Sequence, residues 1–218
     1  MKAKHLILLG LTLLAYTASA QEGNNQVAIE FTKFNIVYKG IENPVTIVAS
    51  DYAAEELSFS VTNGSVETTE TPGRIIIKTS AANNSKLELK ILANETVLRT
   101  IEYVVKTVPD PCFYLGNYRS GSSASIDDII SLPINALKAP IFYYKAEYSV
   151  LEFSIRITEG GIPVSYKISG NKISDNPEAA AAVRKGVKSG DNFNFMSFTI
   201  KTPSGIRPNV PGIVFTVR

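Results

Sequence analysis

Residue types that enzymes use for acid–base or nucleophilic chemistry are scarce in this chain. Its 218 residues include one histidine, His5, and one cysteine, Cys112. His5 lies in a segment that we expect to be removed, so the mature chain should have no histidine. This excludes Ser-His-Asp and Cys-His catalysis and every metal site with a histidine ligand. Cys112 is expected to be a small buried hydrophobe beside Phe113, with pairing to another chain as the alternative.

Three other groups of polar residues have ordinary structural explanations. Asp127 and Asp128 are neighbours on an expected helix, where successive side chains diverge by about 100°, so they suit a first helical turn better than a metal or acid–base pair. Glu55-Glu56 is expected to be a solvated loop. The small-residue run Gly121–Ser125 lacks the lysine of a phosphate-binding loop and is expected to be a flexible loop. We therefore predict no enzyme activity, no catalytic residue, no metal and no cofactor.

The first twenty residues are typical of a secretory signal peptide. Lys2 and Lys4 precede the apolar stretch Leu6–Ala15, and Ala18-Ser19-Ala20 matches a cleavage site. Residues 1–20 are thus predicted to direct export, and no second apolar run is long enough to span a membrane. Without Lys2 and Lys4, 20 basic side chains balance 20 acidic ones. This balance argues against binding nucleic acid or an anionic membrane.

Residues 21–107 are predicted to form an immunoglobulin-like β-sandwich. Short runs that alternate apolar and polar residues follow one another, separated by turn sequences. Asn63-Gly64 predicts a hairpin, and Asn94-Glu95 a second polar turn. About seven strands and no helix favour the sandwich, although the tryptophan and disulfide of antibody domains are absent.

Residues 108–218 are predicted to form an α+β domain, with helices against one face of an antiparallel sheet. Ser125 and Asp128 resemble a capping box, and the apolar residues behind them predict a helix that ends before Pro133. Asn176 and Pro177 have the residue types of a second helix start. The segments Tyr143–Ile157 and Asp191–Lys201 read as long strands. Each changes the phase of its alternation partway along, which predicts a β-bulge.

Two short motifs stand at the heads of the two predicted domains. Asn35–Ile47 reads NIVYKGIENPVTI and contains turn residues, and Val108–Pro111 reads VPDP. The two prolines of VPDP remove backbone donors and hold the chain extended, which predicts a stiff junction between domains. Five residues are expected to shape this region: Asn43, Pro44, Pro109, Asp110 and Pro111.

Exposed tyrosines and sheet edges are the candidate interaction surfaces. Tyrosine is a rigid amphipathic anchor at many interfaces, although it is also an ordinary sheet residue. The edge candidates are Gln26–Phe31 and Ile213–Arg218, to which a partner strand would add. The candidate tyrosines are Tyr114, Tyr118, Tyr143 and Tyr144.

NIVYKGIENPVTI, followed some sixty residues later by VPDP, resembles the periplasmic C-terminal region of the GldM family of gliding-motility proteins and its secretion counterpart PorM. The likeness extends to a short helix in Asp127–Lys138, a strand in Tyr148–Ile157, a helix in Pro177–Gly190 and a terminal hairpin. It implies contact with gliding or type IX secretion ring components in the periplasm of a Bacteroidota-type bacterium, and homodimerisation. A family member of this kind has a membrane helix and a long stalk before these domains, whereas this chain is read as a stand-alone exported protein.

The leading hypothesis is a non-catalytic, exported protein–protein interaction or assembly module of the bacterial envelope. The alternative is an adhesin or a glycan- or ligand-binding module at the cell surface or in the medium, because sandwiches host many functions. The absence of tryptophan weakens the glycan-binding version.

Overall fold

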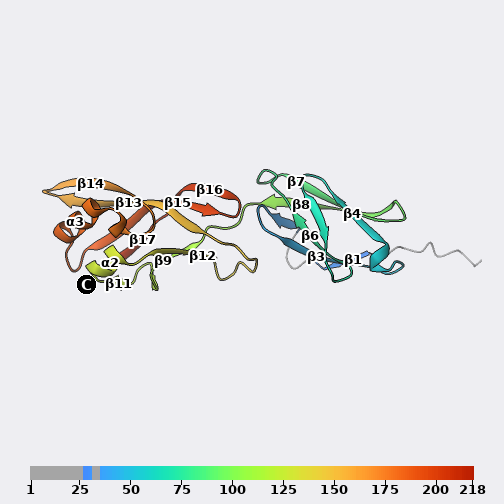
Figure 1. Ribbon diagram of the computed structural model, residues 1–218, viewed down its shortest axis with the longest axis horizontal. Helices are drawn as coiled ribbons and strands as arrows, with labels where there is room; N and C mark the ends of the chain where they lie inside the picture. Colours follow the sequence, from blue (N-terminus) through green and yellow to red (C-terminus); the bar gives the residue numbers. More distant parts are fainter. Residues whose placement is uncertain (1–26, 31–34) are drawn as a thin grey trace, which may run out of the picture.

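A computed structural model describes residues 27–30 and 35–218. The described chain is mainly β and is arranged as two units that lie end to end (Figure 1). Buried side chains form two separate clusters, one between Val37 and Val105 and the other between Phe113 and Val217. The predicted fold class is confirmed: an immunoglobulin-like β-sandwich precedes an α+β domain. The predicted signal peptide lies outside the described residues.

The N-terminal sandwich consists of two facing sheets, with strand orders β1-β3-β6-β5 and β2-β8-β7-β4. Apolar residues on the inner faces of both sheets fill one core, as in β3, where every second side chain is buried. A short 3₁₀ helix, η1 (Ala54–Glu56), precedes β4 where a solvated loop was expected. The strands are β1 (Val27–Glu30), β2 (Ile36–Tyr38), β3 (Asn43–Ala49), β4 (Leu57–Val61), β5 (Ser65–Thr68), β6 (Arg74–Lys78), β7 (Lys86–Ala93) and β8 (Thr96–Lys106).

One of the two predicted sandwich turns is confirmed and the other is wrong. Asn94 and Glu95 have φ of 48° and 65° and close the antiparallel β7–β8 hairpin. Asn63 also has a positive φ of 55°, but it joins β4 to β5, which belong to different sheets. The reason is that an Asn-Gly turn determines only the local reversal of chain direction. Burial of the apolar faces of β4 and β5 determines which strand each of them pairs with.

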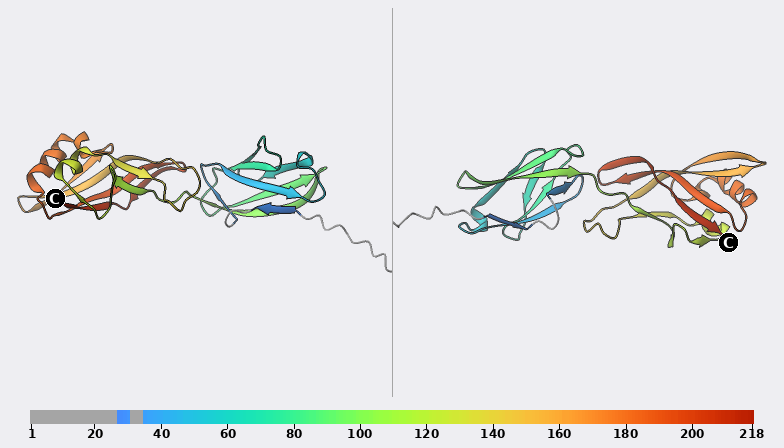
Figure 2. Two further views of the ribbon diagram at one scale, coloured as in Figure 1. Left: turned by 90° about the horizontal axis from the view of Figure 1, so that it is seen from below. Right: turned by 180° about the vertical axis from the view of Figure 1, so that it is seen from behind.

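The C-terminal domain contains one large sheet and one small sheet. The large sheet has the order β11-β17-β15-β13-β14, with β16 paired to β15, and the small one has the order β10-β9-β12. Its helices lie at the end far from the sandwich (Figure 2). The elements are β9 (Cys112–Leu115), β10 (Tyr118–Arg119), β11 (Ser123–Ala124), α2 (Ile126–Ser131), β12 (Ile134–Leu137), β13 (Ser149–Glu159), β14 (Ile162–Ser169), η2 (Ile173–Asp175), α3 (Pro177–Gly186), β15 (Asn192–Thr202), β16 (Gly205–Val210) and β17 (Ile213–Val217).

Both predicted helix starts are confirmed, and the first helix ends before Pro133 as predicted. Asp128 N donates to Ser125 Oγ at 3.0 Å, and Ala179 N donates to Asn176 Oδ1 at 3.0 Å. Helix α2 ends at Ser131, so the rest of the expected segment 127–138 is a turn and the strand β12. Helix α3 ends at Gly186 rather than near residue 190. Within the supposed loop 121–125, Ser123 and Ala124 form β11 and Ser125 caps α2.

The two predicted bulges are confirmed in the pairing of β13 with β15. The register shifts twice, between Val150 and Glu152 and between Glu152 and Ser154. The opposite position in β15 holds Ser197, with a φ of 51°. However, the strand expected from Tyr143 begins only at Ser149, because the residues before it have no neighbouring strand to pair with.

The edge predictions have different outcomes. Strand β1 is an edge strand, paired on one side with β3. Strand β17 is not an edge, because it lies between β15 and β11, and Gly121 N donates to Val214 O at 2.7 Å. The C-terminal segment 213–218 therefore does not offer the open edge that the sequence suggested.

Candidate interdomain joint

Asn43, the first residue of β3, closes a tight turn at the end of the sandwich that faces the C-terminal domain. Its side chain is 2% exposed. Oδ1 accepts from Tyr38 N at 2.7 Å, and Nδ2 donates to the carbonyl oxygens of Tyr38, Ile41 and Ile77 at 2.9, 3.1 and 3.1 Å. The amide thus holds the 38–43 turn closed and ties it to β6. Pro44 follows in β3 with an exposed ring.

The tip of this turn contacts a hairpin of the C-terminal domain. Gly40 has a φ of +79°, and a Cβ at this position would overlap the carbonyl group of Pro203, between β15 and β16. Ser204 Oγ donates to Lys39 O at 2.9 Å. Glycine is required at position 40 because both the positive φ and the close approach of Pro203 exclude a side chain.

An aromatic cluster fills the space beside the turn. Tyr38 at the end of β2 meets Phe142 and Tyr144, with ring centroids 5.0 and 5.3 Å away, and Phe142 and Tyr144 lie 5.5 Å apart. Phe142 is 5% exposed. Burial, with a smaller contribution from Tyr38, raises the pKa of Tyr144. Burial also raises the pKa of Tyr103 in β8 to about 12, with a smaller contribution from Tyr144. Apolar contact thus joins both domains at this point.

The VPDP linker is held by side chains of the C-terminal domain. Arg207 in β16 forms an ion pair with Asp110, and its Nη2 donates to Val108 O at 3.0 Å. The Tyr148 hydroxyl donates to Pro109 O at 2.9 Å. Burial raises the pKa of this hydroxyl, with Arg207 opposing the shift and Asp110 adding to it. Val108 and Pro111 are buried, whereas Pro109 and Asp110 are exposed.

The structure therefore brings both sequence motifs, 35–47 and 108–111, to one joint between the domains. The turn and linker residues that the sequence singled out lie at this joint. Sequence reasoning missed the residues of the C-terminal domain that contact them: Phe142, Pro203, Ser204 and Arg207. The only available signal was the turn sequence Thr-Pro-Ser-Gly at 202–205, and nothing in it indicated what the turn would contact.

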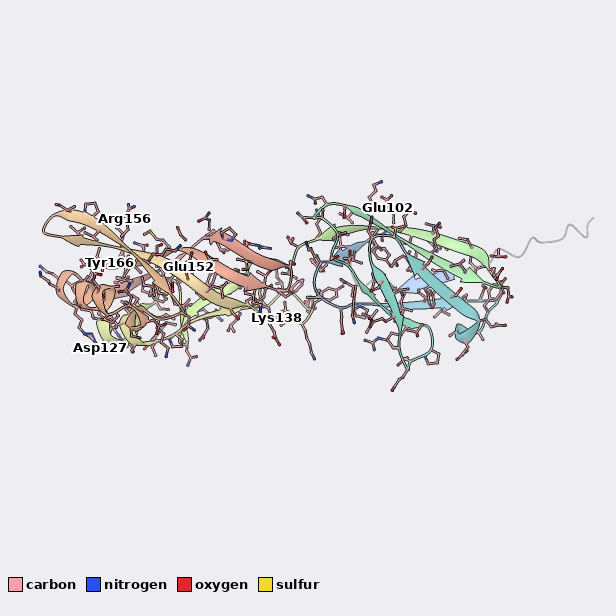
Figure 3. All side chains as sticks on the ribbon, turned by 45° about the horizontal axis from the view of Figure 1, so that its top comes forward. Glu102, Asp127, Lys138, Glu152, Arg156 and Tyr166 are labelled. Carbon is pink, nitrogen blue, oxygen red and sulfur yellow. The ribbon has the colours of Figure 1, made fainter. Side chains whose placement is uncertain are left out.

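The four candidate tyrosines do not form one surface. Tyr143 is 77% exposed and Tyr144 is half-buried, both at the joint. Tyr114 is half-buried in β9, with the Arg119 guanidinium 6.0 Å from its ring centroid. The Tyr118 hydroxyl lies 3.5 Å from Asp128 Oδ2. Tyr114 and Tyr118 thus lie in the sheet of β9 and β10, next to helix α2. Asp127 of α2 lies at the end of the domain that is remote from the joint (Figure 3).

A shallow groove of about 370 Å³ opens beside the joint, between the segment that precedes β13 and the end of β15. Lys145 and Lys201 contribute positive charge to it, and Glu147 contributes negative charge. Its lining residues are Gly40, Ile41, Lys145, Ala146, Glu147, Ser149, Lys201, Thr202 and Pro203.

The other chemical candidates from the sequence lie apart from one another. Asp127 pairs with Arg184 at 3.5 Å, while Asp128 accepts from Ser125 N at 3.3 Å, so the two carboxylates diverge. Cys112 is half-buried at the start of β9 rather than fully buried. Across residues 27–30 and 35–218, no three histidine, cysteine or acidic side chains are grouped so as to hold a metal ion. No helix in this part of the chain has the length and apolar character to cross a membrane.

Comparison with solved structures gives weak likenesses. The Escherichia coli adhesin FdeC aligns with 89% of this chain and 65% of its own, at 14% identity and a TM-score of 0.31. The Yersinia pseudotuberculosis adhesin InvE aligns with 88% of this chain and 58% of its own, at 10% identity and a TM-score of 0.29. The tandem Ig repeats of Dlar align with 89% of this chain and 98% of their own, at 7% identity and a TM-score of 0.28. The chain thus spans less than two thirds of the FdeC and InvE structures.

Comparison of sequences gives a family. No curated protein matches the chain. Residues 26–106, however, match a family described as the GldM third domain. The matched range extends from the start of β1 to the end of β8 and contains the Asn43 turn. The N-terminal sandwich of this chain is therefore similar to the GldM third domain along its whole described length.

Proposed function

We propose that this protein is a non-catalytic, exported interaction or assembly module of the bacterial envelope that acts with the gliding or type IX secretion machinery. The observation that carries the proposal is the match of residues 26–106 to the GldM third domain. In this proposal residues 1–20 are a cleaved signal peptide, residues 21–107 the sandwich domain and residues 108–218 the second domain. The module works in the periplasm through contacts with ring components, as a monomer or a homodimer.

The geometry of the joint supports an assembly role. A module that sets the distance and angle between partners has to keep its own domains in a fixed orientation. Here the ring contacts of Tyr38 with Phe142, the Ser204–Lys39 hydrogen bond and the close approach of Pro203 to Gly40 support such a fixed orientation. Such an arrangement resists the relative motion that is the default for two domains joined by a linker.

The test is crosslinking of the tagged protein in its native cells, followed by identification of the partners and by cell fractionation. We expect a periplasmic protein that captures gliding or type IX secretion ring components. A matched sample carrying an unrelated exported sandwich domain with the same tag controls for non-specific capture. A protein at the cell surface or in the medium, with none of these components captured, would contradict the proposal and favour an adhesin.

A further inference from the structure

A segment without regular structure, residues 138–148, connects β12 to β13 and passes the joint; we refer to it as the strap. Its inner side chains, Phe142 and Tyr144, pack on Tyr38 of the sandwich. Its other large apolar side chains are mostly exposed: Ile141 is 83% exposed and Tyr143 is 77% exposed. The strap therefore has one face fixed in the joint and one apolar face directed outward. Lys138, at its start, lies near the joint in Figure 3.

Leu137, the last residue of β12 and the residue before the strap, is 53% exposed. Thus three of the exposed large apolar side chains of the described chain fall within seven consecutive residues. Single exposed apolar residues are common on protein surfaces, but contiguous groups mark interaction sites. Because Phe142 anchors the strap from below, Ile141 and Tyr143 are presented on a backbone that is already ordered, which lowers the entropy cost of binding.

The main chain of the strap is also available for pairing. Exposure alternates along it, with Ile141, Tyr143, Lys145 and Glu147 exposed and the residues between them buried or half-buried. Within the described chain, the main chain of residues 144–147 makes no hydrogen bond to another main-chain group. Residues 145–147 line the groove beside the end of β15. This geometry suits the addition of an extended segment, in which main-chain bonds give affinity and alternate side chains give specificity.

Charge decides which kind of segment fits. Lys138 lies three residues before Ile141, Lys145 lies two residues after Tyr143, and Lys201 lines the same groove as Lys145. Lys138 Nζ donates to Phe142 O at 2.9 Å, which keeps this ammonium group beside the strap. Glu147 is the one acidic residue in the strap. Complementary charge steers association and rejects partners of like charge, so these lysines favour an acidic occupant.

We propose that the outer face of the strap and the adjoining groove bind an extended segment of a partner protein in which carboxylates alternate with apolar side chains. This proposal rests on the proposed interaction role and adds to it the surface and the chemistry of the partner.

The direct test measures binding of two synthetic octapeptide libraries to the purified full chain by fluorescence anisotropy. One library alternates acidic and apolar positions, and the other has lysine in place of each acid. We expect the acidic library to bind and the basic one not to bind. The double variant Ile141→Ser, Tyr143→Ser should weaken binding of the acidic library at least about tenfold, the loss typical of an interface anchor. Lys145→Glu should weaken it as well.

Ile162→Ser is the matched control, because Ile162 is 67% exposed in β14, away from the strap. This variant should bind as the wild type does, and all variants should keep the wild-type melting temperature because the changed side chains are exposed. Equal binding of both libraries, or binding that the double variant leaves unchanged, would overturn the proposal. Self-association that depends on Ile141, measured by sedimentation, would also overturn it and assign the surface to a second copy.

The peptide assay, read together with crosslinking of the wild-type protein in cells, separates this proposal from the proposed function. If the acidic peptides fail to bind while secretion or gliding components are still captured, the strap proposal is wrong and the envelope role stands. If the acidic peptides bind at the strap but no such components are captured, the docking surface stands and the proposed role is wrong.

Discussion

At the scale of single residues, Asn43 holds the 38–43 turn closed and also ties that turn to β6. The surrounding sequence predicts only the turn. Its place between Gly40 and Pro44 predicted a turn, and the structure has that turn. Its amide donates to three carbonyl oxygens, one of them in β6. These contacts could not be predicted from the sequence, because the fold brings β6 beside the turn. A side-chain amide is suited to this position because it offers an acceptor and two donors in one plane. Patterns of hydrophobicity do not identify a buried polar residue whose side chain bonds to the main chain of a turn.

The first prediction concerns this amide. Asn43→Ala leaves buried carbonyl groups and one N–H without their partner, and should lower the free energy of unfolding by about 2–3 kcal/mol. Asn43→Asp should cost more at neutral pH, because a carboxylate would face carbonyl oxygens. The folded state should raise the pKa of this new carboxyl, so the difference between the Asp variant and the wild type should shrink as pH falls. Urea denaturation at several pH values measures both effects, with Asn35→Ala as an exposed control. Equal stability of the Ala variant and the wild type would refute the assigned role.

At the scale of elements, the sequence was informative wherever a short-range rule determines structure. The helix caps at Ser125 and Asn176 and the phase changes in β13 and β15 depend on neighbours within a few residues, and all are present. The strand prediction is wrong for residues 143–148 of the strap, because apolar and polar residues alternate there with the period of a strand although no second strand lies alongside. Asn63-Gly64 was misread for a related reason, since the pairing of β4 and β5 is set by two separate sheets.

The second prediction tests the bulge in β15. Ser197 is exposed and has a φ of 51°, a conformation that disfavours residues other than glycine. Ser197→Gly should therefore raise the free energy of unfolding by roughly 1 kcal/mol, and Ser197→Val should lower it by about 1–2 kcal/mol. Thermal and chemical denaturation of both variants give the comparison. The reverse order of stability, with Val above Gly, would mean that a positive φ does not constrain this bulge.

At the scale of the whole molecule, side chains of both domains meet at the joint. The linker prolines alone would give a stiff connector, but a connector without side contacts leaves rotation between the domains free. Arg207 and Tyr148 attach the linker to the C-terminal domain, while Ser204 and Phe142 attach the C-terminal domain to the sandwich. None of these pairs is predictable from the sequence, because their members are separated by as many as 165 residues.

The third prediction removes one of these attachments. Arg207→Ala should widen the distribution of domain orientations without unfolding either domain, because the residue contacts the linker and neither core. Small-angle X-ray scattering should show a broader distance distribution at large separations, while the melting temperature changes little. Arg156→Ala is the control, since Arg156 is exposed on β13, away from the joint (Figure 3). A scattering profile identical to that of the wild type would show that the remaining contacts suffice.

The parallel pairing of β2 with β8 has a mechanical consequence. Ile36 to Tyr38 lie beside Val104 to Lys106, so the first strand of this sheet and the last point in the same direction. Tension applied between the start of β2 and the end of β8 pulls these two strands in opposite directions along their length. Their hydrogen bonds, including Val104 N to Asn35 O and Lys39 N to Lys106 O, then bear the load together rather than opening one after another. This parallel pair therefore resists tension between residues 35 and 106 by shear along the strands.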